Sequence, residues 1–433
     1  MREKISQLTL NLQNQTIAPL WPFLNDQLIG DVAVGQQYVW QRKSKIIFRG
    51  VRIAMLFRST GMMIFLVGFI KVFKIYHDVK KKQHGKKIQN FCCDHIFMTH
   101  GANAEKFIWR DYLSETQGSI AYVNIASSEG LEKFQIPALR YLIFGVLKNT
   151  IGLSKKIKII CKNLQIPTMD FLTQAALHIG EYAFFQKFFQ QQKKYALKTV
   201  TFLALYPAAH ACRFAQIKII YRSHGLIRLS IPMLKPDEML VIAPEEKIYF
   251  ESAFHPVFSC RVSSTPAMLA GRLQKSILIL PPQSFEPYLS ETQNNFNHFL
   301  CWAVSQDFKI IVRPSPTMRE DSIFALEKLL TCPITLDPPI EDFEKSLSYW
   351  RPMFVLGLNS TGLYTALSIG IIPISVCHPI LEKHVYSGVY PFAQRAFFWP
   401  RDQMLLENIL ASDPSVYSQV IMRLSHSQEK KIS

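Results

Sequence analysis

Four short segments of the sequence place polar side chains at the predicted end of a buried strand. Asn359, Ser360 and Thr361 follow the apolar run "MFVLGL" and precede a helical segment that ends at Gly370. Ser360 or Thr361 can cap the free N–H groups at the start of this helix, where the helix dipole is positive. Such a terminus binds phosphate without a lysine, although ordinary helix capping explains the same residues.

Arg313 and Ser315 stand at the end of the apolar strand in "IIVRPSP", where two prolines stiffen the loop. An arginine can donate two parallel hydrogen bonds to one phosphate. A surface ion pair is the alternative interpretation of Arg313. Because both anion-binding candidates occur in the same half of the chain, each strengthens the prediction of a phosphate site there.

Two histidine–glycine pairs close apolar segments in the first half of the chain. His224 follows the strand in "IIYRSHG", with Arg222 two residues before it, and His100 follows "HIFMT". A histidine at a strand end can act as a general base near neutral pH. A lone histidine is more often structural, so catalysis by His224 is one of two interpretations. His100 and Arg222 are secondary candidates.

The elements that position these residues are short apolar strands alternating with helical stretches, which predicts parallel sheets covered on both faces. We therefore expect an α/β fold with two Rossmann-like, doubly wound domains facing one another, and ligands beyond the carboxyl ends of the strands. The predicted parts are a basic helical N-terminal segment over 1–90, a first Rossmann-like domain over 91–265, a second over 266–420 and a polar tail over 421–433. The segment "KIKIICKNL" is equivocal between strand and helix.

Composition limits the kind of partner. The formal net charge of +17 favours a polyanion, which can be nucleic acid, an anionic membrane surface or a phosphorylated substrate.

The eight cysteines are scattered without CxxC or zinc-type spacing, so we expect reduced thiols in the cytoplasm and no metal. No dinucleotide-binding or P-loop glycine motif is present, and no signal peptide is expected. Without a helix-turn-helix, zinc-finger or RNP signature, nucleic acid is not expected as the partner.

One segment, "RIAMLFRSTGMMIFLVGFIKVFK", imitates a membrane span. Its uninterrupted apolar run, Gly61 to Ile70, is about half of the roughly 20 residues that a span requires. The stretch from Lys71 to Lys87 then carries seven lysines against one aspartate. The open interpretations are a buried helix with a solvated basic tail, a helix lying on an anionic membrane surface and a true span.

Taken in chain order, "HG" at 224–225, "RPSP" at 313–316 and "NSTGLYTALSIGIIPI" at 359–374 resemble the marks of bacterial glycosyltransferases of the GT-B fold. The closest group is the surface-polysaccharide type, which includes sialyl- and polysialyltransferases, capsule Kdo transferases and polyol-phosphate transferases. In that group a strand-end HG lies near the acceptor, whereas a strand-end HP and a later S-S/T turn bind the donor phosphate. Ser315 stands where the family has its histidine, and no acidic D/E-D/E-G motif is clear.

The resemblance implies a metal-independent glycosyltransferase without a cofactor, which moves a sugar from a nucleotide donor, CMP-linked in the closest group, to a glycan or glycolipid. His224 would take the proton of the acceptor hydroxyl. The donor-phosphate residues would be Arg313, Ser315, Asn359, Ser360 and Thr361. Peripheral attachment to the inner membrane through Lys71–Lys87 would suit an acceptor in a lipid leaflet. A degenerate nucleotide- or glycan-binding protein, motivated by Ser315, and a basic nucleic-acid-binding protein are the alternatives.

Overall fold

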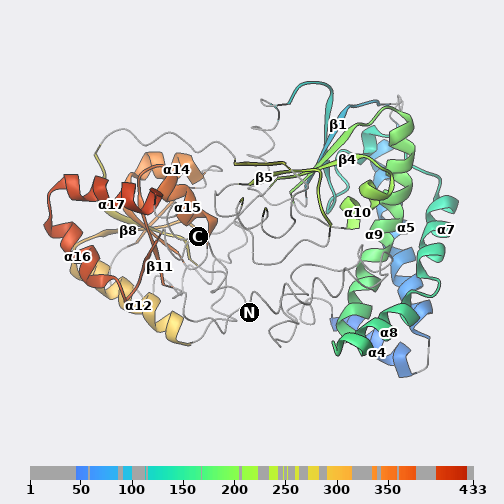
Figure 1. Cartoon of the computed structure of the whole chain (residues 1–433), viewed down its shortest axis with the longest axis horizontal. Helices are drawn as coiled ribbons and strands as arrows, with labels where there is room; N and C mark the ends of the chain where they lie inside the picture. Colours follow the sequence, from blue (N-terminus) through green and yellow to red (C-terminus); the bar gives the residue numbers. More distant parts are fainter. Residues whose placement is uncertain are drawn as a thin grey trace. The chain divides into compact units, whose positions relative to one another are not determined.

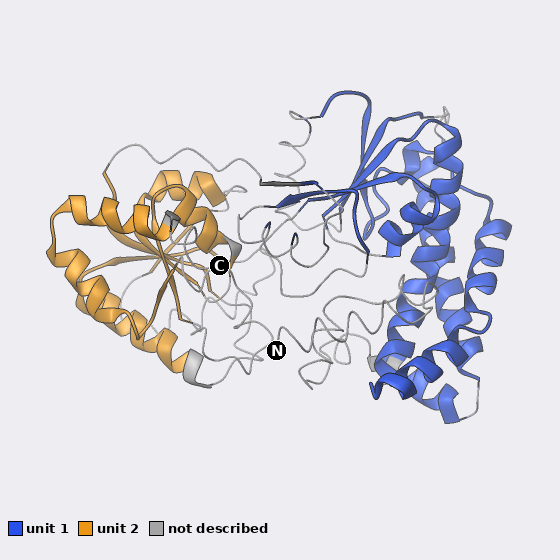
Figure 2. Cartoon of the chain, in the orientation of Figure 1, with its two compact units in different colours: residues 1–224, 229–241, 247–262 blue, residues 225–228, 242–246, 263–433 orange. Residues whose placement is uncertain are grey.

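The computed structural model describes residues 45–56, 59–85, 91–99, 116–166, 168–203, 207–222, 234–241, 259–262, 272–281, 290–314, 334–338, 343–357, 360–376 and 396–426, with the single residues 113, 247 and 251. The chain divides into two compact units, which Figure 2 colours separately. Unit 1 comprises residues 1–224, 229–241 and 247–262, and unit 2 comprises residues 225–228, 242–246 and 263–433.

Unit 1 is built on a parallel sheet that has, among the described residues, the strand order β2-β1-β3-β4-β5-β6. Its strands are β1 (His95–Thr99), β2 (Ile120–Asn124), β3 (Thr199–Phe202), β4 (Lys218–Arg222), β5 (Glu238–Val241) and β6 (Ser259–Val262). Runs such as "TVTF" form continuously buried strands because a parallel sheet is covered on both faces.

The helices of unit 1 gather around the long helix α9, as Figure 1 shows. They are α4 (Lys45–Leu56), α5 (Thr60–Gln83), α7 (Leu139–Thr150), α8 (Leu153–Leu164), α9 (Thr168–Lys194) and α10 (Pro207–Phe214), with a 3-10 turn, η2 (Leu131–Lys133). Helices α5 and α9 cross closely at Gly68 and Gly180, since a Cβ on Gly180 would lie 2.4 Å from the carbonyl oxygen of Gly68.

An aromatic cluster forms the centre of the unit 1 core. Phe188 of α9 packs edge-on against Phe134 at a centroid distance of 5.4 Å, and Phe189 packs against Phe202 of β3 at 6.5 Å. All four rings are almost completely buried. This packing ties α9, a helix rich in Phe and Gln, to the sheet and makes it a core element.

Unit 2 contains a second parallel sheet, whose order among the described residues is β12-β11-β10-β7-β8-β9. Its strands are β7 (Gln274–Ile279), β8 (Lys309–Val312), β9 (Ile334–Leu336), β10 (Pro352–Gly357), β11 (Ile372–Ser375) and β12 (Phe397–Phe398). Its helices are α12 (Ser290–Ser305), α14 (Phe343–Trp350), α15 (Thr361–Ser368), α16 (Gln403–Ala411) and α17 (Pro414–His426).

Alternate residues of these strands enter two separate cores. Ile277 and Ile310 pack with α12, α16 and α17, whereas Leu278 and Ile311 pack with α14 and α15. Helices therefore cover both faces of the sheet. Two parallel, helix-covered sheets with additional N-terminal helices confirm the predicted α/β class with two Rossmann-like domains, the pair of domains that the GT-B resemblance implies.

The described N-terminal helices α4 and α5 pack inside unit 1, and α17 extends from Pro414 to His426. The domain boundaries at residues 90, 265 and 420 stay predictions. No described helix combines the length and the apolar content that crossing a bilayer takes.

Candidate functional site

The two predicted anion-binding elements leave the same edge of the unit 2 sheet. Arg313 directly follows β8, and its N–H donates to the carbonyl of Ile279 at the end of β7 over 3.0 Å. The N–H of Leu280 donates in turn to Leu356 of β10 over 2.8 Å. Arg313 and the end of β10 therefore lie at the same level with only β7 between them, about 10 Å apart at the strand spacing of parallel sheets.

Ser360 is the N-cap of α15. Its backbone is extended, with φ −86° and ψ 136°, and its Oγ accepts a hydrogen bond from the N–H of Gly362 over 3.2 Å. A hydroxyl that accepts this bond still carries one O–H donor. The positive end of α15 and the Ser360 hydroxyl thus lie together at the carboxyl edge of β10.

The first turn of α15 is packed against its neighbours without spare room. A Cβ on Gly362 would lie 2.6 Å from Cδ1 of Leu280 and 3.0 Å from Cε1 of Phe343, the first residue of α14. At the other end, Gly370 adopts φ +85° and donates to Leu367 over 3.0 Å. The sequence prediction of a short helix between a hydroxyl cap and Gly370 is confirmed, and its start is held rigidly on the sheet edge.

Arg313 is held by a polar network at the ends of β8 and β9. Its Nη1 donates to Oδ2 of Asp337 over 2.6 Å and to the hydroxyl of Ser346 over 2.5 Å. Ser346 also donates to Asp337, and Nε1 of Trp350 donates to the other carboxylate oxygen of Asp337 over 2.7 Å. The side chain of Asp337 is completely buried, and that of Arg313 is 18% exposed. The ion pair that was the alternative interpretation of Arg313 is therefore present, and its two side chains are mostly buried.

Phe343 connects the two parts of this edge. Its ring centroid lies 5.4 Å from Cζ of Arg313, and its Cε1 approaches Gly362 in the first turn of α15. Arg313 and the start of α15 are therefore positioned by one shared aromatic side chain. The partners Asp337, Ser346 and Phe343 were not identified from the sequence, where only the strand-end position of Asp337 in "PITLDPP" hints at a role.

In unit 1, Arg222 is the last residue of β4 and is buried at the carboxyl edge of the sheet, beside Leu240 of β5. His224, His100, Ser315 and Asn359 lie outside the described residues, as does the side chain of Thr361. The structure therefore brings Arg313 and Ser360 to one edge, and the roles of the other candidates stay predictions.

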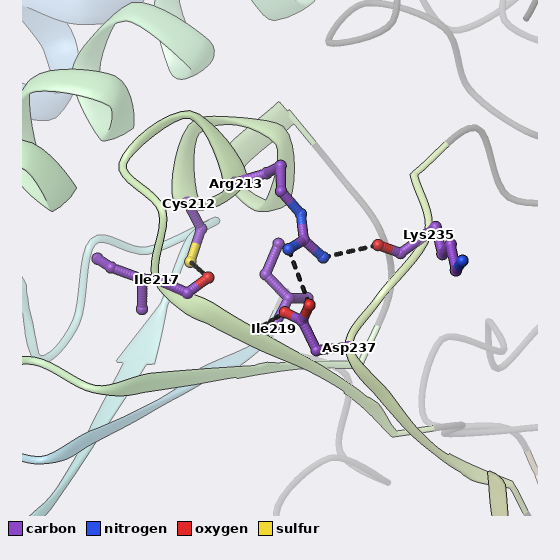
Figure 3. Close-up of polar contacts among 6 residues, drawn as sticks. All are labelled: Cys212, Arg213, Ile217, Ile219, Lys235 and Asp237. Atoms are coloured by element: carbon purple, nitrogen blue, oxygen red, sulfur yellow. Dashed lines mark hydrogen bonds and ion pairs between the residues drawn. The ribbon is translucent and has the colours of Figure 1, made fainter. Parts of the chain in front are cut away.

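The opposite, amino edge of the unit 1 sheet carries a structural network, shown in Figure 3. Arg213 at the end of α10 donates to Oδ1 of Asp237 over 2.9 Å and to the carbonyl of Lys235 over 2.7 Å. Asp237 also accepts from the N–H of Ile219 over 2.7 Å. These contacts pin the start of β5 to β4. Since ligands of such folds bind at the carboxyl ends of strands, this network is not part of a candidate site.

One carboxyl group and two imidazoles on α9 and α10 have shifted pKa values, and none of them was singled out from the sequence. Burial raises the pKa of Glu181 to about 7, against the opposing effects of Lys71 and of the backbone of Ala208. Burial lowers the pKa of His178 to about 4 and that of His210 to about 3. Among the described residues, Oε1 of Glu181 has no hydrogen-bond partner. No described group of three or more acidic, cysteine or histidine side chains has the arrangement of a metal site.

At the level of sequence, no family model matches the chain, and no curated protein does. Several solved structures are similar to it in fold. MurG of Acinetobacter baumannii shares 14% identity over 77% of this chain and 94% of its own, with a TM-score of 0.43. The S. aureus MnaA–UDP structure shares 12% over 75% and 89%, with a TM-score of 0.46. The spinosyn rhamnosyltransferase SpnG with thymidine diphosphate shares 9% over 76% and 94%, with a TM-score of 0.40. These similarities are distant, so the fold assignment rests on the two parallel sheets.

Proposed function

We propose that this protein is a glycosyltransferase that moves a sugar from a nucleotide donor to an acceptor hydroxyl, and that α15 binds the donor phosphate. The observation that carries the proposal is the Ser360 cap of α15 at the carboxyl edge of a doubly wound parallel sheet. Ligands of such sheets bind beyond the strand ends, and a helix N-terminus offers phosphate both N–H donors and a positive dipole end.

Arg313 has a supporting role in this proposal. Because Asp337 balances its charge, the guanidinium acts as a fixed donor whose direction is set by Asp337 and Ser346. A donor held in place before the reaction stabilises charge that develops on the departing phosphate without reorganisation. The N-terminus of α15 supplies the larger share of anion binding, aided by Thr361, Asn359 and Ser315.

The proposed chemistry is a displacement at the anomeric carbon. The acceptor oxygen forms a new bond to that carbon while the bond from carbon to the phosphate oxygen breaks, and the nucleotide leaves with the bonding electrons. His224 takes the proton of the acceptor hydroxyl, and Arg222 and His100 lie on the acceptor side. By the sequence resemblance, the donor is a CMP-linked, sialic acid- or Kdo-like sugar, the acceptor is a bacterial surface glycan or glycolipid and the step needs no metal. The scattered cysteines favour a cytoplasmic enzyme.

Nucleotide binding gives the first test. We expect the melting temperature of the full chain to rise with at least one of CMP, CDP, UDP, GDP and NAD, because a ligand that binds only the folded state stabilises it. The double variant Ser360→Ala/Thr361→Ala should weaken that nucleotide's binding at least tenfold. Ser368→Ala is the matched control, since Ser368 lies at the other end of the same helix and donates to Thr365 over 2.8 Å. Equal nucleotide affinity in the double variant and the control would remove the assignment of α15.

A second candidate function is nucleotide or glycan binding without catalysis. Two observations favour it, namely the ion pair of Arg313 with Asp337 and the serine at 315 where the family has a histidine. Hydrolysis of the donor distinguishes the two functions. Donor turnover that disappears in His224→Ala supports the enzyme, whereas tight donor binding with no turnover in the wild-type chain supports the binding protein.

A further inference from the structure

Helix α5 presents an apolar face to solvent. Met62, Leu66, Ile70 and Phe73 are 63%, 47%, 64% and 47% exposed. Their spacing of four, four and three residues places them on one side of the helix, and Phe69 stacks on Phe73 at the edge of this side. We call these four residues the α5 stripe. Along the helix axis it spans about 16 Å.

The buried side of α5 is the opposite one. Its buried residues are Thr60, Ile64, Gly68, Val72, Ile75, Val79 and Gln83. At 100° per residue these point away from the α5 stripe and pack towards α9 and α7, with Gly68 in close contact with Ile179 and Val146. One face of α5 therefore packs into the core of unit 1. The apolar residues of the α5 stripe lie on the other face and are not part of that core.

The same exposed side turns basic towards the end of the helix. His77 and Lys80 continue the line of the α5 stripe, and Lys80, Lys81 and Lys82 occupy the last turn of α5. Lys74 is exposed beside the stripe, and Asp78 is the one acidic residue of the helix. A helix face with apolar residues followed by lysines suits an anionic lipid bilayer, in which an apolar layer lies beneath negatively charged headgroups.

The helices that contact α5 also expose large apolar side chains. Helices α4 and α7 both contact α5. Exposed large apolar side chains on them are Ile46, Ile53 and Leu56 of α4 and Tyr141, Phe144 and Leu147 of α7, and Ile151 directly after α7 is exposed as well. Soluble proteins seldom expose so many large apolar side chains on adjoining helices without a partner.

We propose that unit 1 docks on an anionic lipid surface through α5, with the α5 stripe entering the headgroup layer and Lys80 and Lys81 binding lipid phosphates. Apolar burial and attraction to anionic lipids add up in this mode of binding. Each lysine near such a surface contributes about 1 kcal/mol, which is about fivefold in affinity. The docking does not depend on the proposed transfer reaction, so the two can fail separately.

Flotation of the full chain with lipid vesicles tests the docking. We expect the wild-type chain to float with vesicles of mixed phosphatidylcholine and phosphatidylglycerol and to float far less with phosphatidylcholine alone. Raising the salt from about 0.1 M to about 1 M should weaken the binding, since the Debye length falls from about 10 Å to about 3 Å. A wild-type chain that stays unbound to the anionic vesicles, or that binds both kinds equally, overturns the proposal.

Two pairs of variants locate the surface. Leu66→Gln/Ile70→Gln should lower vesicle affinity at least tenfold, whereas Met404→Gln/Leu405→Gln should leave it unchanged, because Met404 and Leu405 are exposed apolar residues of α16 in the other unit.

Lys80→Gln/Lys81→Gln should lower the affinity more than tenfold, with Arg272→Gln/Lys345→Gln as the control of equal charge. If the first α5 variant does not fold, as judged by its thermal melt, the lysine pair still decides the question.

The competing occupant of this face is a second copy of the chain. Sedimentation of the same variants separates the two cases. A wild-type dimer that Leu66→Gln/Ile70→Gln converts to a monomer, with vesicle flotation unchanged, assigns the α5 stripe to self-association and overturns the proposal. Loss of flotation with an unchanged oligomeric state supports it.

Discussion

The guanidinium of Arg313 and the carboxylate of Asp337 form an ion pair of 2.6 Å between the ends of the neighbouring strands β8 and β9. Asp337 is completely buried and also accepts hydrogen bonds from Ser346 and Trp350. The pair therefore fixes three elements of unit 2, namely β8, β9 and α14, at the edge where α15 begins.

Removing Asp337 should destabilise unit 2 strongly. Asp337→Ala leaves a mostly buried guanidinium without its counter-charge, a change that typically costs about 3–5 kcal/mol. Urea denaturation followed by tryptophan fluorescence measures the loss, and the exposed Lys345→Ala variant on the same helix as Ser346 is the control. A loss below about 1 kcal/mol would contradict the structural role assigned to this pair.

Ser360→Asp separates helix capping from phosphate binding. Aspartate is as good an N-cap as serine, so the variant should keep the wild-type melting temperature. Its carboxylate repels a phosphate at the same place, so nucleotide affinity should fall at least tenfold. Ser360→Thr should keep both properties. If the Asp variant binds nucleotide as well as the Thr variant does, phosphate does not bind at this cap.

Alanine substitutions at two glycines of α5 should have opposite effects on stability, because only one of the two lies at the crossing with α9. A Cβ on Gly68 would lie 2.5 Å from Cγ2 of Ile179, so Gly68→Ala should cost about 1–3 kcal/mol through overpacking. A Cβ on Gly61 would lie 3.7 Å from its nearest neighbour, Oγ of Ser154, so Gly61→Ala should stabilise by up to about 1 kcal/mol. Thermal melts of the two variants check both signs, and equal shifts would contradict the tight crossing.

Much of unit 2 could be predicted from the sequence because its patterns are local. The apolar runs before Arg313 and Asn359 gave the strands, and the hydroxyl cap and Gly370 gave both ends of α15. The partner of Arg313 in its ion pair could not be predicted, since Asp337 is 24 residues away and is brought near only by the order of β8 and β9.

In unit 1 the sequence was less informative, because tertiary packing decides between competing local patterns. The segment "KIKIICKNL", which alternates like a strand, lies within α8, where Ile157 and Ile160 face the core one helical turn apart. Glu181 was not recognised because nothing local distinguishes it from the other polar residues of a Phe- and Gln-rich helix. Most of α9 is buried, Glu181 included.

The buried Glu181 makes the stability of unit 1 depend on pH in a direction opposite to most carboxylates. Burial raises its pKa from the ordinary 4.5 to about 7, so between these values the folded chain holds a proton that the unfolded chain releases. The stability contributed by this group is complete below pH 4.5 and is lost as the pH rises through about 7. His178 and His210 act in the opposite sense, and the stability that they contribute is lost as the pH falls through 6.5, where the imidazoles of the unfolded chain take up protons.

The difference in melting temperature between the wild type and Glu181→Gln, measured from about pH 5 to about pH 8, therefore isolates Glu181, since His178 and His210 contribute equally to both chains. We expect Glu181→Gln to gain stability relative to the wild type as the pH rises across this window. Lys71→Met should move the wild-type loss to higher pH, because Lys71 holds the pKa of Glu181 down. Parallel curves for wild type and Glu181→Gln would show that this carboxyl group titrates alike in the folded and unfolded chain.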